Sequence, residues 1–206
     1  MYTELKEGVL KTIQSLAAAL EAKDSYTTGH SERVARYAVR LAKKIEMSEV
    51  QVEKIRSMCL VHDIGKIGIN EELLNKPGRL MKHEFDLIRE HPIIGVNIIK
   101  PLNLSPEEIA IVKHHHERFD GHGYPDGIKS EKLFREVRVA TICDAFDAMT
   151  SDRPYRRSLP LEKAIKELVE GAGTQFDPDL VPIFTDMIKA GEIKDIMINK
   201  ITLRAV

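Results

Sequence analysis

The sequence predicts an all-α domain preceded by a long N-terminal helix. Almost every periodic segment places apolar residues three or four positions apart, which is the spacing of one helix face. No segment alternates apolar and polar residues in the way that is typical of a half-buried strand. The chain has 206 residues, 43% of them hydrophobic and 31% charged, so it can bury a substantial core. These observations predict a helical bundle.

The first predicted helix covers residues 3–23. Its apolar stripe consists of Leu5, Val9, Ile13, Leu16 and Leu20. This helix either packs on the core or acts as a signalling helix that pairs with a second subunit or joins an upstream sensor. We therefore divide the chain into an N-terminal linker helix over 1–24, a main domain over 25–192 and a tail over 193–206, whose structure the sequence leaves open.

Further helices are predicted in the first half of the domain. One runs from about residue 28 to 45, and a second covers 49–64 and ends at Gly65. Residues 67–80 form a loop with a short helical turn. A helix over about 82–90 stops near His91-Pro92, because proline disfavours α geometry at the residue before it.

The second half begins with a clear helix start at Ser105-Pro106-Glu107-Glu108, which combines a serine cap, an early proline and a capping-box glutamate. This helix runs into three consecutive histidines, 114–116. Residues 120–130 form a turn-rich loop, and 134–150 form another helix. Two more helices begin near Pro160 and Pro178 and end near Gly171 and Gly191.

Composition excludes several classes of partner. The net charge of −1 gives no overall attraction to a nucleic acid polymer or an anionic membrane, so any phosphate recognition must be local. No apolar run approaches the length of a membrane span. Cys59 and Cys143 have no CxxC spacing and lie in apolar helical segments, which predicts buried reduced thiols in a cytoplasmic protein.

Histidine and aspartate side chains recur in the mixture that hydrolytic metal centres use: His62, Asp63, His91, His115, His116 and Asp144. Such ligands hold a cation and leave coordination positions open for water and substrate. Two ions about 3.5–4 Å apart can activate a bridging hydroxide, and a carboxylate must bridge them. Asp63 is the natural bridge, because its apolar neighbours predict burial and a buried carboxylate without a cation is costly. The sequence therefore predicts a metal-dependent phosphohydrolase.

Neighbouring residues compete for some of these roles. His115 and His116 are about 100° apart around a helix, so both can face inward. His114 follows Lys113 and is expected to face solvent. Asp144 lies on an apolar stripe where an unpaired carboxylate would be destabilising, and Asp147, one turn later, competes with it as a ligand.

The strings HDIGKIGI, HHERFDGHGYPDG, DAFDAMTSDRPYR and GAGTQFDP resemble the HD-GYP domain, a branch of the HD phosphohydrolase superfamily, in order from about Tyr26 to Phe184. The resemblance implies an all-helical HD-domain bundle that hydrolyses cyclic di-GMP to pGpG, and in some members further to GMP. It implies that Asp63 bridges two metals. His30, His62 and Asp144 would complete the first metal site, and His91, His115 and His116 the second.

The resemblance also bears on the metals. Some members carry a glutamate, one turn before the first histidine, that enables a third metal. Tyr26 stands there in this chain, so we expect two metals. Histidine and aspartate sites accept iron or manganese, which we expect, and also nickel or zinc.

Substrate contacts are implied in the same way. Lys66 would lie near a phosphoryl oxygen, and Arg153 and Arg156 would contact the phosphate backbone or guanine through their planar forks. Tyr124 in the GYP turn would either wall the substrate cleft or present a docking surface for a diguanylate cyclase. Glu117 either orients a histidine or holds this loop. His83 and His122 are expected to be exposed.

The leading prediction is a cyclic di-GMP phosphodiesterase. Cyclic GMP-AMP would suit the same metals. A second class is an output module that binds the nucleotide, or a partner through the GYP loop, with little turnover. A mononucleotidase is disfavoured by the complete GYP and RPYR motifs. The N-terminal helix would be the contact of a homodimer.

Overall fold

The computed structural model describes residues 29–152 and 157–197, together with Gly8, 11–13, 15–18 and Leu20. Within these ranges the chain is helical and forms no sheet, only an isolated bridge between Ala172 and Phe176. The α-helices are α2 (His30–Lys44), α3 (Glu49–Cys59), α4 (Glu71–Leu74), α5 (Lys82–Ile88), α6 (His91–Ile99), α7 (Pro106–His114), α8 (Arg135–Thr150), α9 (Leu161–Glu170) and α10 (Leu180–Lys189). Short 3-10 turns are η1 (Ile64–Gly68), η2 (Lys100–Leu102) and η3 (Ser130–Lys132). The all-α prediction is confirmed.

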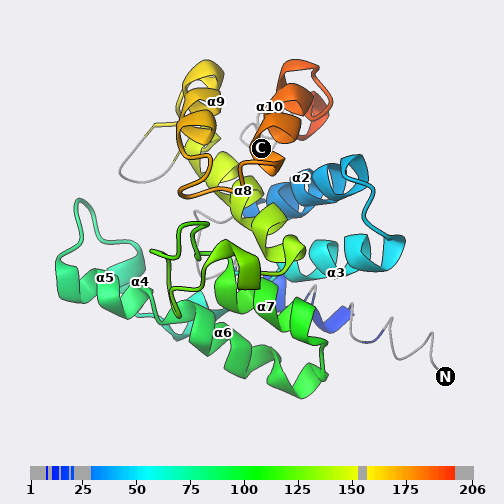
Figure 1. The fold of residues 1–206 in the computed structure, drawn as a ribbon. Coiled ribbons are helices and arrows are strands. Elements are labelled where there is room, and N and C mark those ends of the chain that lie inside the picture. The colour runs from blue at the N-terminus through cyan, green and yellow to red at the C-terminus, as the bar shows by residue number, and fades with distance from the viewer. Residues whose placement is uncertain are drawn as a thin grey trace.

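Helix α8 runs through the middle of the bundle (Figure 1). Helices α9 and α10 lie on one side of it and α6 and α7 on the other, while α4 and α5 project from the edge. Three buried aromatic rings join α2, α8 and α10: the rings of Tyr37 and Phe146 are 5.4 Å apart, and those of Phe146 and Phe184 are 5.3 Å apart. These edge-to-face contacts fix the long helices on which the site is built.

The helix predicted over 49–64 ends earlier, at Cys59. His62 and Asp63 lie in tight turns after it, and η1 follows. The expectation that Gly65 ends the helix is therefore wrong. A Cβ atom at this position would lie 1.8 Å from the carbonyl oxygen of His91, so glycine is needed for the close approach of η1 to α6.

The segment around Pro92 also differs from expectation. The predicted helix does stop before it, at Ile88, but a new helix, α6, starts at His91. Pro92 occupies the first turn of α6, where its missing N–H costs nothing. The proline therefore marks a helix start that the sequence patterns did not indicate.

The other elements predicted between residues 28 and 191 are confirmed, within a few residues at their ends. Helix α7 begins at Pro106, and the Ser105 N–H donates to the Glu108 carboxylate over 2.9 Å. Cys59 and Cys143 are free and buried. None of the helices in the described ranges combines the length and apolar character needed to cross a bilayer.

The two terminal segments are described only in part. The described residues before position 21 are helical, and Ile13 and Leu20 are buried in the core, as in the core-packing alternative. The rest of the predicted N-terminal helix lies outside the described residues. Ile193 and Ile196, at the start of the tail, are fully buried.

Candidate metal centre

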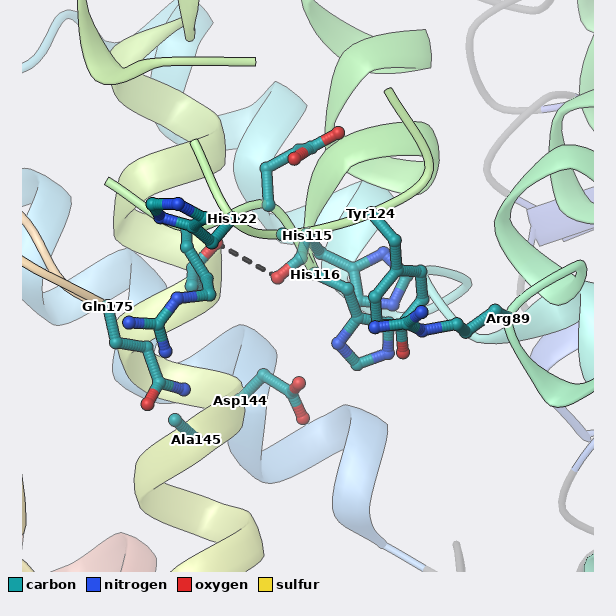
Figure 2. Close-up of a pocket in the computed structure, with 12 residues that line it drawn as sticks. Arg89, His115, His116, His122, Tyr124, Asp144, Ala145 and Gln175 are labelled. Carbon is teal, nitrogen blue, oxygen red and sulfur yellow. Dashed lines mark hydrogen bonds between the residues drawn. The ribbon is translucent and has the colours of Figure 1, made fainter. Parts of the chain in front are cut away.

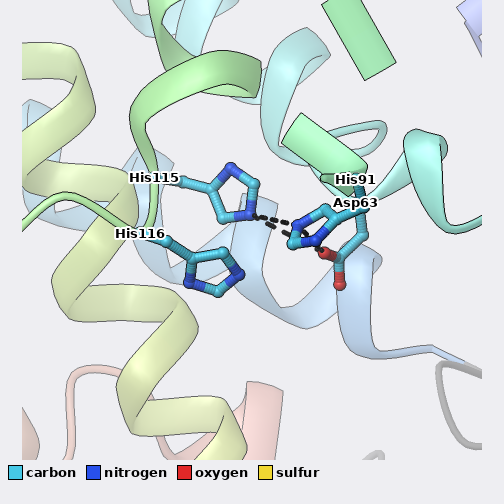
Figure 3. Close-up of side chains that lie close together, drawn as sticks. All are labelled: Asp63, His91, His115 and His116. Carbon is cyan, nitrogen blue, oxygen red and sulfur yellow. Dashed lines mark hydrogen bonds and ion pairs between the residues drawn. The ribbon is translucent and has the colours of Figure 1, made fainter. Parts of the chain in front are cut away.

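Two groups of side chains converge on one region of the bundle. Asp63, His91, His115 and His116 form the first group, and His30, His62 and Asp144 form the second. Within each group the potential ligand atoms lie within 4.8 Å of one another. Figure 3 shows the first group, with His115 and His116 following α7 and His91 opening α6. The structure thus brings together all the residues predicted as ligands.

The Asp63 carboxylate lies between the two groups. Its Oδ1 is 3.3 Å from His91 Nε2 and 3.6 Å from His115 Nε2, while Oδ2 is 3.5 Å from His62 Nε2. Ligand atoms about 2.1 Å from one cation are themselves about 3–3.4 Å apart. One oxygen of Asp63 therefore faces each group, as a bridging carboxylate requires.

Three of the histidine rings are oriented in the same way. Each Nδ1 lies near the backbone carbonyl three residues earlier: His62 with Cys59 (2.7 Å), His91 with Ile88 (2.7 Å) and His115 with Val112 (3.0 Å). A carbonyl oxygen only accepts, so each ring donates its Nδ1 proton. In its neutral form, a ring held in this way directs the Nε2 lone pair into the site.

Several acceptor atoms of the two groups have no hydrogen-bond donor among the described residues. His62 Nε2 and Asp63 Oδ1 are buried without a hydrogen-bond partner among the described residues. His91 Nε2 and His115 Nε2 lie 3.3 Å apart. Because both rings already donate through Nδ1, both of these Nε2 atoms are acceptors in the neutral form, and neither can donate to the other. Buried acceptors left without a donor are costly. Divalent cations would satisfy them all, so the donor set suits a metal centre.

His30 is held by an aspartate. Its Nδ1 donates to Asp147 over 2.7 Å, and its Nε2 lies 3.2 Å from Asp144. Asp147 is fully buried and also accepts from the Arg33 guanidinium over 2.7 and 2.9 Å. Asp147, considered above as a rival ligand, lies outside both groups and orients His30.

The titratable side chains of the centre differ in the direction in which their pKa values are shifted. Burial lowers the pKa of His30, but hydrogen bonds to Asp144 and Asp147 outweigh it and raise the pKa to about 9. Burial dominates at His62 and lowers its pKa to about 4. At Asp63, burial is offset chiefly by Lys66, and the pKa stays well below its usual value. The carboxylate between the groups is therefore ionised.

Lys66 reaches the same carboxylate. Its ammonium group lies 2.6 Å from Asp63 Oδ2 and is half-buried. The lysine expected near a phosphoryl oxygen therefore borders the centre.

A cavity of about 190 Å³ opens beside the two groups (Figure 2). Its lining includes Arg89, His116, Arg118, Tyr124, Asp144 and Gln175. The Tyr124 ring stacks on the His116 ring at a centroid distance of 4.8 Å. Tyr124 therefore forms part of the cavity wall.

The loop that carries Tyr124 is anchored by Glu117. This buried carboxylate accepts backbone hydrogen bonds from Asp126, Gly127 and Ile128 over 2.7, 3.0 and 3.2 Å. Of the two roles considered for Glu117, the structure supports holding the loop.

His114 corrects one expectation. Its side chain is only 13% exposed and lies 3.7 Å from Glu117, because the loop folds back over the end of α7. It does not face solvent freely. His83 and His122 are exposed, as predicted.

The remaining predicted positions lie outside the described residues: Tyr26, Arg153 and Arg156. Sequence reasoning did not identify Arg89, Gln175 or the Arg33–Asp147 pair. A signal for the pair existed, because Arg33 lies one turn after His30 on an otherwise apolar helix face.

Comparisons with known proteins agree with this geometry. The HD domain family model matches residues 14–180. The chain is 38% identical over 200 residues to the cyclic di-GMP phosphodiesterase of Thermotoga maritima, covering 95% of this chain and 53% of the relative. It is 34% identical over 167 residues to 3'3'-cGAMP-specific phosphodiesterase 3 of Vibrio cholerae, covering 81% and 36%.

A solved structure shares the fold. The cyclic GMP-AMP-specific phosphodiesterase V-cGAP3 of V. cholerae superposes with a TM-score of 0.68 at 18% identity, over 94% of this chain and 53% of that chain.

The chain spans about half the length of the curated relatives that it matches. Because the family model covers most of the sequence and its motifs meet in one centre, the chain belongs to the HD-domain family, in agreement with the HD-GYP resemblance.

Proposed function

We propose that the chain is a metal-dependent phosphodiesterase that hydrolyses cyclic di-GMP to pGpG, with further cleavage to GMP as a second step. The observation that carries the proposal is the ionised Asp63 carboxylate between two groups of ligand atoms. The relative from T. maritima, named a cyclic di-GMP phosphodiesterase, supports the choice of substrate.

HD-domain phosphohydrolases use divalent metals, and we propose that two ions bind here. His30, His62 and Asp144 would hold one ion, and His91, His115 and His116 the other, with Asp63 shared. Iron or manganese is expected, with nickel or zinc as alternatives. When bound, such a pair supplies an activated water and neutralises charge on phosphorus.

The protein's own residues contribute positioning and charge. Lys66, beside Asp63, can donate to a phosphoryl oxygen as negative charge develops there. Tyr124 would wall the substrate cavity. Arg153 and Arg156 remain proposed contacts to the phosphate backbone or guanine.

The second candidate substrate is cyclic GMP-AMP. It is favoured by the similarity to the V. cholerae relative named as specific for 3'3'-cGAMP. The same metal ligands would act on either substrate.

Other predictions from the sequence are kept as proposals. These are the division at residues 24 and 192, a homodimer through the N-terminal helix, a diguanylate cyclase docked on the GYP loop, and a cytoplasmic location. The substrate would be a free cyclic dinucleotide and not a nucleic acid polymer.

One assay tests the central proposal. Purified protein loaded with Mn²⁺ or Fe²⁺ is incubated with cyclic di-GMP or cyclic GMP-AMP, and linear products are followed by chromatography. Asp63→Ala is expected to abolish turnover, whereas the exposed Asp186→Ala should match the wild type. Full activity in Asp63→Ala contradicts the mechanism. Tight binding without product under either metal would favour the output module.

A further inference from the structure

Four side chains form a continuous stack, and three of them lie in the wall of the cavity beside the metal centre. The Arg89 guanidinium lies 4.9 Å from the centre of the Phe85 ring and 4.9 Å from that of Tyr124. Tyr124 in turn stacks on His116. Figure 2 shows Arg89 against the Tyr124 ring, next to His116. The stack therefore connects the end of α5 to a predicted metal ligand.

Both are cation–π contacts, which involve the charge of the guanidinium and do not use its N–H groups as hydrogen-bond donors. The N–H donors therefore stay available to a ligand. The carboxylate of Asp86 lies 4.0 Å away, which is too far for a hydrogen bond. The Arg89 side chain is 42% exposed, so a ligand can reach it.

The other arginine that lines the cavity is already paired. Arg118 donates to Asp120 over 3.1 and 2.7 Å. Among the described residues that line the cavity, Arg89 is thus the arginine that donates no hydrogen bond to a carboxylate.

A cyclic dinucleotide carries two phosphodiester anions. When one of them lies at the metal centre, the other needs a counter-charge within the same small cavity. An arginine held against two rings suits this role, because its fork donates two parallel hydrogen bonds and loses little side-chain freedom on binding.

We propose that Arg89 is a substrate-binding residue that contacts the phosphodiester of the cyclic dinucleotide remote from the metals. This inference rests on the proposed function. It also gives Tyr124 a defined role, because its ring orients both Arg89 and His116.

The test compares wild type with Arg89→Gln and Arg89→Lys as metal-loaded proteins. Arg89→Gln removes the charge, and Arg89→Lys keeps the charge but not the planar fork. Arg56→Gln is the matched control, because Arg56 is likewise exposed and likewise near an acidic residue three positions earlier, Glu53. KM and kcat are measured with cyclic di-GMP, and affinity is measured by calorimetry with its non-hydrolysable bis-phosphorothioate analogue.

For Arg89→Gln we expect KM and the analogue Kd to rise about 10- to 100-fold, with kcat changed less than about threefold. Arg89→Lys should be intermediate, Arg56→Gln should match wild type, and the metal content of all variants should be equal. Wild-type turnover together with unchanged KM and Kd in Arg89→Gln overturns the role of Arg89 and leaves the proposed function standing. Absence of wild-type turnover rejects the proposed function instead. In that case weaker analogue binding by Arg89→Gln still supports an anion-binding Arg89, and equal or absent binding rejects it.

Discussion

Asp147 accepts a hydrogen bond from His30 Nδ1 over 2.7 Å and so ties the first residue of α2 to the C-terminal half of α8. Asp144, one turn earlier on α8, lies 3.2 Å from the other nitrogen of the same ring. Helix α8 therefore supplies both a candidate ligand and the group that aims the histidine opposite it. Arg33 balances the charge of Asp147, which allows that carboxylate to be fully buried beside Asp144.

Asp147→Asn should weaken metal binding without removing a ligand. A neutral amide lacks the negative charge that holds His30 and Arg33 in place. The affinity of the centre for one of its two ions should therefore fall about 10- to 100-fold. Loss of the carboxylate charge opposite the buried Arg33 guanidinium should also lower the unfolding free energy by about 3–5 kcal/mol. Elemental analysis after dialysis and denaturant titration measure the two effects.

Asp195→Asn is the control for this change, because Asp195 also pairs with arginines but is 51% exposed. It should leave metal content unchanged and alter stability far less. Equal metal retention in Asp147→Asn and wild type would show that Asp147 has a structural role alone and does not influence metal binding through His30.

Removal of single ligands should separate the two metal positions. Asp144→Asn, which alters the second group alone, should retain about one ion per chain, whereas Asp63→Asn should lose both because its carboxylate faces each group. Metal stoichiometry by mass spectrometry tests this. Two retained ions in Asp63→Asn would contradict a bridging role.

Metal uptake should depend on pH through His30. In the metal-free protein burial lowers the pKa of this ring, but the two aspartates raise it to about 9, so Nε2 carries a proton at neutral pH. An incoming cation must displace that proton. Apparent affinity should therefore rise with pH by up to about tenfold per unit and level off above about 9. Competition with a chelating dye from about pH 6.5 to 9.5 measures the slope, and a flat profile would refute it.

Glu117→Gln should loosen the loop that carries Tyr124. Three backbone donors lose a charged acceptor, and each such hydrogen bond contributes about 1.5–3 kcal/mol when intact. We expect faster proteolysis within 120–130 and a higher KM. Glu167→Gln, on an exposed face of α9, is the control and should cleave at the wild-type rate.

Much of the fold follows from local patterns. The helix beginning at Pro106 and the helix containing Asp144 were predictable because capping residues and a continuous apolar face act over a few positions. The ligand set was equally accessible, since charged residues such as Asp63 and Asp144 stand among apolar neighbours.

Other features depend on contacts distant in sequence. Gly65 resembles a helix end until the His91 carbonyl is placed against it. Arg89 carries no local signal, because its role arises only when α5 meets the loop that holds Tyr124. Arg153, Arg156 and the N-terminal helix stay predictions.

The pairing of three imidazoles with carbonyls three residues upstream has a wider consequence. Each ring takes its tautomer from its own short turn, at Cys59–His62, Ile88–His91 and Val112–His115, independently of the others. The length of chain between these turns can then change without misaligning any donor. The same set of metal ligands can therefore be kept while the segments between the turns diverge to suit new substrates.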